Sequence, residues 1–157
     1  TVGQLYDTCN FRGALQECLR LSTLVNQYLE ETSPWTTAKT DMDATARSIY
    51  TSLQAISGLK TMWAPILPFT SQQLHEMLGE GGTLFGEQLV ETYEEPSKSH
   101  IALTYDGSEA AGSWQRLAVP VGRQLPKPEP LFKRLEPSVV DEELARLGQG
   151  LEDSAEE

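Results

Sequence analysis

The sequence SPWTTAK, from Ser33 to Lys39, decides the fold because it separates two long segments with helical periodicity. Pro34 ends the first segment, since its ring clashes with the preceding turn and moves Ser33 out of the α region. The chain must therefore reverse at this corner, and Trp35 follows immediately. A tryptophan in a loop either packs across helix ends or offers a flat surface for stacking.

Two long amphipathic helices are predicted on either side of the corner. Before it, apolar residues recur at three- and four-residue steps from Asn10, a good N-cap, to about Glu31. After it, a second apolar stripe begins near Asp41 or Asp43, either of which can cap a helix, and ends before Pro65. The short connection makes the two helices antiparallel neighbours.

The periodicity weakens after these two helices. A third, shorter helix is predicted to begin with the capping-box pattern of Thr70 and Gln73 and to end at Gly79. Beyond it the helical pattern is lost, and short extended segments are predicted at 101–105, before an Asp-Gly turn, and at 117–121.

The C-terminal part contains a stiff segment and a last helix. Lys127–Pro130 is expected to be extended and to deliver the apolar pair Leu131 and Phe132 into a groove. Ser138 and Asp141 are expected to start the final helix.

Together these patterns predict an all-α fold. We expect an antiparallel helical bundle over residues 1–80 and an irregular extension over 81–136 that packs back on the bundle. A C-terminal helix over 137–148 and an acidic, disordered tail over 149–157 follow.

The formal net charge of −11 argues against a general nucleic-acid binder, which would carry a basic surface. Up to Ile66 the chain has five basic and six acidic residues, so the acidity belongs to the second part. Any RNA contact in the first part therefore has to be local and to depend on shape. No apolar run approaches the roughly 18–20 residues that cross a bilayer, and no membrane partner is expected.

The two cysteines, Cys9 and Cys18, are too few for a disulfide framework and lack metal-ligand spacing. We therefore expect reduced thiols in a cytoplasmic protein, with Cys18 as a small core residue. Thr1 is not an initiating methionine, and a fragment of a longer protein is expected.

Catalytic constellations are missing from the sequence. It has no Gly-rich loop after a strand, no nucleophile elbow and no paired histidines. The adjacent carboxylates Glu94–Glu95 and Glu142–Glu143 would diverge on a regular element, which is typical of a solvated surface. No catalytic residue, metal ligand or cofactor is therefore expected in this chain.

Trp35 is the main candidate for a functional side chain. Physical considerations alone slightly favour a plug across the helix ends, and the alternative is a platform on which a base stacks. Lys39 is a candidate phosphate contact or an ordinary solvated lysine, and Asn26 is either a polar reader or merely exposed. Trp63, on the apolar stripe, is expected in the core, and Trp114 is expected to anchor the extension.

The order of these residues resembles the anticodon-binding helical domain of methionyl-tRNA synthetases. The resemblance rests on FRGAL at 11–15, Asn26–Tyr28, Pro34-Trp35 and Lys39, and then on Lys127–Phe132. It covers most of the chain from Phe11 to Gly148. Related synthetases for Leu, Val, Ile and Cys share the bundle, and a protein-interaction bundle without an RNA role remains the alternative from another class.

The resemblance implies a role in reading the CAU anticodon of methionine-accepting tRNA. It assigns to Trp35, at the Pro34 corner, stacking on an anticodon base, with Lys39 and Asn26 as nearby candidates. Two further readers of the family, an Asn and an Arg, lie on the helix before Asn10 and are not present here.

The resemblance also implies what lies elsewhere in such a ligase. The signatures of the catalytic domain are absent, so ATP belongs to that domain, and zinc is left open for it. The expected partners are tRNA and the catalytic domain of the same protein, with no DNA. On its own, this chain is expected to bind tRNA weakly or not detectably.

Overall fold

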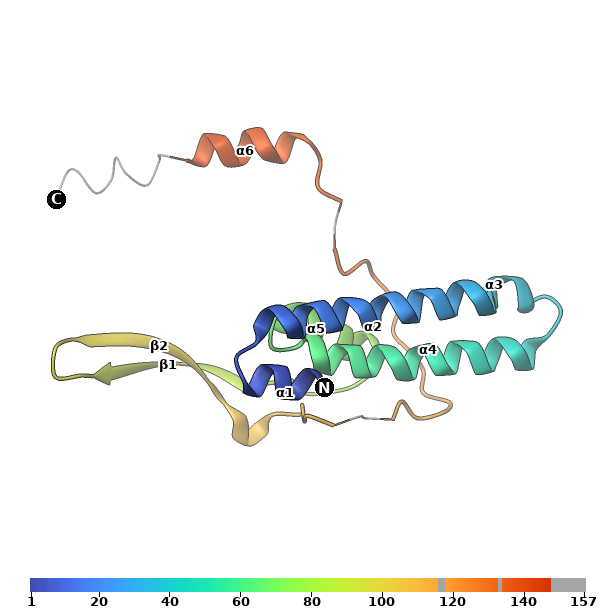
Figure 1. Cartoon of the computed structure of the whole chain (residues 1–157), viewed down its shortest axis with the longest axis horizontal. Coiled ribbons are helices and arrows are strands. Elements are labelled where there is room, and N and C mark those ends of the chain that lie inside the picture. Colours follow the sequence, from blue (N-terminus) through green and yellow to red (C-terminus); the bar gives the residue numbers. More distant parts are fainter. Residues whose placement is uncertain (116–117, 133, 148–157) are drawn as a thin grey trace.

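The computed structural model describes residues 1–115, 118–132 and 134–147. A helical bundle is followed by a β-hairpin and a long extension that carries the last helix (Figure 1). Within these residues no helix is both long and apolar enough to span a membrane. The elements are α1 (Val2–Asp7), α2 (Phe11–Thr32), α3 (Pro34–Thr37), α4 (Met42–Trp63), α5 (Pro68–Met77), β1 (Glu87–Glu94), β2 (Ser99–Asp106), the 3-10 turn η1 (Gly107–Glu109) and α6 (Ser138–Arg146).

The helices α2 and α4 form the frame of the bundle and lie side by side in antiparallel directions (Figure 1). Their N-termini are capped as predicted. The side chain of Asn10 accepts a hydrogen bond from the backbone N–H of Gly13 at 3.0 Å, and Asp41 accepts one from Ala44 at 2.8 Å. Each cap satisfies one of the amide groups that lack a partner in the first helical turn.

The predicted start of the third helix is wrong, whereas that of the last helix is confirmed. The helix α5 begins at Pro68, so Thr70 lies inside it, and α6 begins at Ser138 as predicted. At Pro68 the proline fixes φ near the helical value and has no N–H to leave unpaired, so it favours the first helical position over a later capping box. Gly79 follows the end of α5 with a φ of 72°, as its predicted role as a stop requires.

A small apolar core joins α1, α2 and α4. Its fully buried members are Val2, Ala14 and Cys18, and the partly buried side chains packed against them include Met62 and Trp63. The expectation that Cys18 and Trp63 belong to the core is thereby confirmed. The indole N–H of Trp63 is satisfied by the hydroxyl oxygen of a serine on α2, 3.2 Å away.

The predicted all-α class is wrong, because β1 and β2 pair along eight residues each in an antiparallel hairpin. The sequence signal located only the second strand, at 101–105. Strand β1 was missed because its sequence, EQLVETYE, is rich in carboxylates and all of its residues are exposed. A strand without a buried face lacks the regular apolar alternation that identifies strands.

Val119 and Trp114 are two of the residues through which the extension packs back on the bundle. Val119 is buried, and its carbonyl oxygen accepts a hydrogen bond from the side-chain amide of Gln54 at 2.9 Å. Trp114 meets Tyr6 edge-on, with 5.9 Å between the ring centroids, which fits its predicted role as an anchor.

The other predictions for the C-terminal part are either wrong or lie outside the described residues. Phe132 is 67% exposed, so the predicted docking of the Leu131–Phe132 pair is wrong for this ring. Of the segment predicted at 117–121, residues 118–121 form no strand and Leu117 lies outside the described residues. The predicted tail at 149–157 lies outside them too.

A buried charge cluster joins α4 to the end of α5. Lys60 is 1% exposed, and its ammonium group donates to the carboxylate of Glu80 at 2.5 Å. Nδ1 of His75 lies 2.7 Å from the same carboxylate, and Nε2 lies 2.9 Å from the carbonyl oxygen of Gly81. Because a carbonyl oxygen only accepts hydrogen bonds, Nε2 of His75 is the donor in the contact with Gly81.

The cluster also attaches the extension to the bundle. Arg123 lies 4.0 Å from Glu80 and donates to the carbonyl oxygen of Leu78 at 3.3 Å. Three consecutive parts of the chain therefore depend on one buried carboxylate. A buried ion pair tolerates the loss of one partner poorly, because the remaining charge is left without compensation.

We therefore expect Lys60→Met to lower the free energy of unfolding by about 3 kcal/mol or more, because Glu80 would stay buried without its main cation. Chemical denaturation followed by circular dichroism measures the change. Lys98→Met, which removes an exposed lysine from the hairpin loop, is the matched control and should change the free energy by less than about 0.5 kcal/mol. Equal effects of the two substitutions would contradict the role of the cluster.

A second prediction concerns the pH dependence of stability. The hydroxyl of Tyr6 donates to the carbonyl oxygen of Met62 at 2.8 Å, and burial, with the neighbouring Cys18 thiol, raises the pKa of Tyr6 from 10.0 to about 12. The folded state holds the neutral phenol more tightly than the unfolded state, so this stabilisation is full below pH 10 and is lost as the pH rises towards 12.

The difference in unfolding free energy between the natural protein and Tyr6→Phe should therefore stay constant below pH 10 and fall above it. Urea denaturation at a series of pH values measures both proteins, and contributions of the other tyrosines cancel in the difference. A difference that does not change above pH 10 would contradict the assignment.

Candidate nucleic-acid interface

The corner between α2 and α4 is made by a residue in the left-handed region. Ser33 has a φ of 39° and a ψ of 60°, which is uncommon for a residue with a Cβ and costs about 1 kcal/mol. Two hydrogen bonds hold it: its N–H donates to the carbonyl oxygen of Leu29 at 2.9 Å, and its hydroxyl donates to that of Glu30 at 2.6 Å. The chain thereby leaves α2 at a fixed angle.

Pro34 and Trp35 then take opposite environments. Pro34 is the first residue of α3 and is buried, whereas the side chain of Trp35 is 62% exposed. The sequence predicted that Trp35 lies in a loop; this prediction is wrong, because Trp35 lies on the four-residue helix α3. Within the described residues the Trp35 indole N–H has no hydrogen-bond partner, in contrast to that of Trp63.

The other side of the corner is tied to α4. The hydroxyl groups of Thr37 and Thr45 lie 2.7 Å apart, and the N–H of Asp41 donates to the carbonyl oxygen of Thr37 at 2.7 Å. Asp41 at the same time caps α4. The short helix is therefore held from both ends, and Trp35 projects from a rigid support, as a stacking surface requires.

The remaining predicted site residues lie near this corner. Lys39 is exposed in the turn after α3, and Asn26 is exposed on α2, about two turns before its end. Neither side chain has a hydrogen-bond partner within the described residues. The structure thus places Trp35 and Lys39 at one end of the bundle, with Asn26 further along α2 and Pro34 inside.

The electrostatics of the corner are acidic. Between Glu30 and Arg47 the chain carries four acidic and two basic residues, Lys39 and Arg47, and all six are exposed. Two cations make few phosphate contacts, so most of the affinity for a nucleic acid here has to come from bases.

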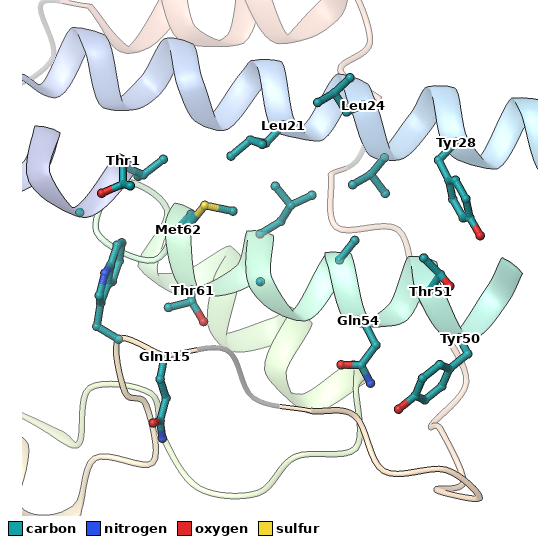
Figure 2. Close-up of a pocket in the computed structure, with 17 residues that line it drawn as sticks. Thr1, Leu21, Leu24, Tyr28, Tyr50, Thr51, Gln54, Thr61, Met62 and Gln115 are labelled. Atoms are coloured by element: carbon teal, nitrogen blue, oxygen red, sulfur yellow. The ribbon is translucent and has the colours of Figure 1, made fainter. Parts of the chain in front are cut away.

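An apolar groove of about 770 Å³ runs between α2 and α4 (Figure 2). Tyr28 of α2 and Tyr50 of α4 lie at the end nearer to the corner, whereas Thr1 lies at the other end. Trp114 also lines the groove. The other lining residues are Val2, Gly3, Leu21, Leu24, Val25, Thr51, Gln54, Ala55, Gly58, Leu59, Thr61, Met62 and Gln115.

The groove is unsuited to metal chemistry. Its lining is mostly aliphatic and aromatic, and its polar members are hydroxyl and amide side chains. Among residues 1–115, 118–132 and 134–147, no group of three or more His, Cys, Asp or Glu side chains is placed to hold a metal ion.

Residues 1–100 match the family model described as the anticodon binding domain of methionyl tRNA ligase, which is well over half of the chain. The chain belongs to this family. Membership decides against the scaffold alternative and against the corresponding domains of the Leu, Val, Ile and Cys enzymes.

The family match is supported by similar proteins. The chain is 44% identical to the methionine–tRNA ligase of Chloroflexus aurantiacus over 148 residues, 41% identical to that of Chloroflexus aggregans and 40% identical to that of Thermomicrobium roseum. These alignments cover 94%, 94% and 93% of the chain but 25% of each relative. The chain thus spans about a quarter of the length of these relatives.

The sequence analysis did not identify the residues that fix the corner between α2 and α4, nor the aromatic residues that line the groove. The left-handed Ser33 leaves no composition signal, because serine also fits ordinary turns. Tyr50 is on α4, and a second aromatic side chain one helix away from Tyr28 was the only available hint. The pairing of Thr37 with Thr45 depends on the angle between α3 and α4, which the sequence does not show.

The stability of the corner distinguishes a plug from a platform. Because Trp35 is mostly exposed, Trp35→Ala should change the free energy of unfolding by less than about 1 kcal/mol, as surface substitutions do. Trp63→Ala, which removes a core indole, should cost about 3 kcal/mol or more. Urea denaturation compares the two variants, and an unfolded Trp35→Ala protein would restore the plug interpretation.

Proposed function

We propose that this chain reads the CAU anticodon of methionine-accepting tRNA on behalf of a full-length methionine–tRNA ligase (the parent ligase). The observation that carries the proposal is the exposed Trp35 on a rigid corner, in a domain of the anticodon-binding family. Base stacking on an aromatic ring is worth about 1–3 kcal/mol and tolerates any base, so polar side chains must add the choice of sequence.

The other candidate residues take distinct roles in this proposal. Pro34 is buried, so it positions Trp35 and leaves the stacking to the indole. Lys39 follows α3 and meets a phosphate of the anticodon loop, whereas the amide of Asn26 bonds to a base edge.

The groove offers a surface for an upstream helix that would carry the family's two additional anticodon-reading residues. The N-terminal end of α1 opens on it, since Thr1, Val2 and Gly3 are among its lining residues. In the parent ligase, a helix continuing upstream from α1 would lie along this apolar surface towards Trp35. The Asn and Arg on that helix would then join Trp35 in reading the anticodon.

The parent ligase supplies the chemistry. Its catalytic domain attaches methionine to the tRNA with ATP in the cytoplasm, and zinc, where used, belongs to that domain. This chain contributes no catalytic residue, and its partners are the tRNA and the catalytic domain of its own protein. Its acidity disfavours RNA bound in other places, since carboxylates repel phosphates.

Substitution of Trp35 in the parent ligase tests the proposal. We expect Trp35→Ala to lower kcat/KM for tRNA by roughly 5- to 150-fold, which corresponds to the loss of one stacked base. The rate of methionine-dependent ATP–pyrophosphate exchange, which needs no tRNA, should not change. Trp114→Phe, at the other largely exposed indole of the described chain, is the matched control and should leave both rates unchanged.

Tryptophan fluorescence gives an independent readout in the same variants. A stem-loop with a CAU anticodon should quench the tryptophan fluorescence of the natural ligase but not that of the Trp35→Ala variant. The binding constant of the stem-loop should depend only weakly on salt concentration, because few phosphates are contacted. An unchanged kcat/KM in Trp35→Ala, or equal quenching by a stem-loop with another anticodon, would refute the assignment.

A further inference from the structure

The hairpin of β1 and β2 extends away from the bundle, at the end opposite to α3 (Figure 1). Its strands pair with each other along their whole length, from Glu87 opposite Asp106 to Glu94 opposite Ser99. Every residue of β1 is exposed. An isolated two-stranded hairpin is at best marginally stable in water and needs to pack against another surface. The side chains on its two faces therefore indicate the chemistry of that surface.

One face of the hairpin carries four exposed apolar or aromatic side chains, next to the polar Gln88, Thr92, Glu94 and Ser99. Residues directly opposite each other in an antiparallel pair point to the same side, which places Val90 with Leu103, and Ile101 and Tyr105 two residues away on either side of Leu103. These four residues form the apolar face. Their exposed fractions are 68% for Val90, 59% for Leu103, 70% for Ile101 and 42% for Tyr105.

The opposite face is richer in polar side chains, although Leu89 and Ala102 lie on it too. The rings of Tyr93 and His100 stack with centroids 5.7 Å apart, and the hydroxyl of Tyr93 donates to the carboxylate of Glu91 at 2.6 Å. Glu87 and Asp106 lie on this face too. Alternation of an apolar face with a polar face is typical of a sheet that is covered on one side and solvated on the other.

The charge of the hairpin excludes RNA as the cover. From Glu87 to Glu109 the chain has six acidic residues and one basic residue, Lys98. Such a segment repels phosphates. It complements a protein surface that has an apolar centre and basic residues around it.

The size of the apolar face excludes a second copy of the chain. Four side chains fall far short of the roughly 800 Å² per partner that stable complexes bury. A contact this small holds when the two surfaces belong to one chain, because the covalent connection supplies a high effective concentration. About three quarters of the length of the relatives lies outside the part that this chain covers, so such a surface is available.

We propose that the apolar face of the hairpin docks on the catalytic domain of the parent ligase, on an apolar patch surrounded by basic residues. This proposal rests on the proposed function, since it takes the covering surface from the same ligase. The contact would lie at one end of the bundle and Trp35 at the other (Figure 1). It would hold the anticodon corner at a constant distance and angle from the site where methionine is attached.

Hydrogen exchange in the parent ligase without tRNA tests the proposal. The amides of residues 87–106 should be protected in the natural ligase. Leu103→Lys, on the apolar face, should accelerate their exchange at least about ten-fold, because the charge would prevent docking. Leu89→Lys introduces the same charge on the opposite face and should alter exchange less than about two-fold.

The same samples distinguish docking on the catalytic domain from contact with tRNA or with a second copy of the chain. Protection that appears only on addition of tRNA, that rises with protein concentration, or that is lost equally in both variants would overturn the proposal. A photo-crosslinking side chain at position 103 should link to a residue of the same chain outside these 157 residues, and a link to a second copy or to tRNA would likewise overturn it.

The outcome is independent of the anticodon assignment. The comparison of the natural ligase with Leu103→Lys and Leu89→Lys is made without tRNA, so its failure would leave the Trp35 experiment unaffected. Conversely, if Trp35→Ala left kcat/KM for tRNA unchanged, hydrogen exchange would still show whether Leu103 is covered in the parent ligase.

Discussion

The reversal of the chain at Ser33 and Pro34 is the constraint on which the rest of the structure depends. Ser33 accepts a strained backbone conformation, with a φ of 39°, so that the buried Pro34 can begin a new helix at an angle to α2. Because Pro34 is turned inward, the next side chain, Trp35, is turned outward. The same reversal returns α4 alongside α2 and so creates the core and the groove.

The bundle separates two surfaces of opposite character. One end presents a bare indole with two nearby cations, and the other extends an acidic hairpin with one apolar face. The 22 residues of α2 span about 33 Å between them. A rigid spacer of this kind holds the two surfaces at a fixed separation.

The stability of this spacer depends on polar interactions as much as on apolar burial. The fully buried apolar cluster is small, and several of the most buried side chains are polar, including Lys60 and His75. Glu80 holds both of them and, through Arg123, the extension. Burying such a network costs desolvation free energy, which is compensated only when every member is paired. Because Glu80 contacts several elements, one substitution in the network affects all of them.

Local chemistry made part of the fold predictable. The caps at Asn10 and Asp41 and the stop at Gly79 were predicted correctly because each depends on a side chain or a φ angle within a few residues. The start at Ser138 was predicted correctly, whereas the start at Thr70 was wrong because Pro68, two residues earlier, offered a competing local signal. Strand β1 was missed because its only partner is β2, and its carboxylates hide the alternation.

The sequence by itself determined the two long helices, the corner between them and the residues that resemble an anticodon reader, because periodicity, prolines and caps act over short distances. Only the tertiary structure decided that Trp35 is bare and Pro34 buried, that Lys60 and His75 share one carboxylate, and that one face of the hairpin is left uncovered. Exposure and pairing depend on which distant segments meet, and that is set by the angles between elements and not by the order of residues.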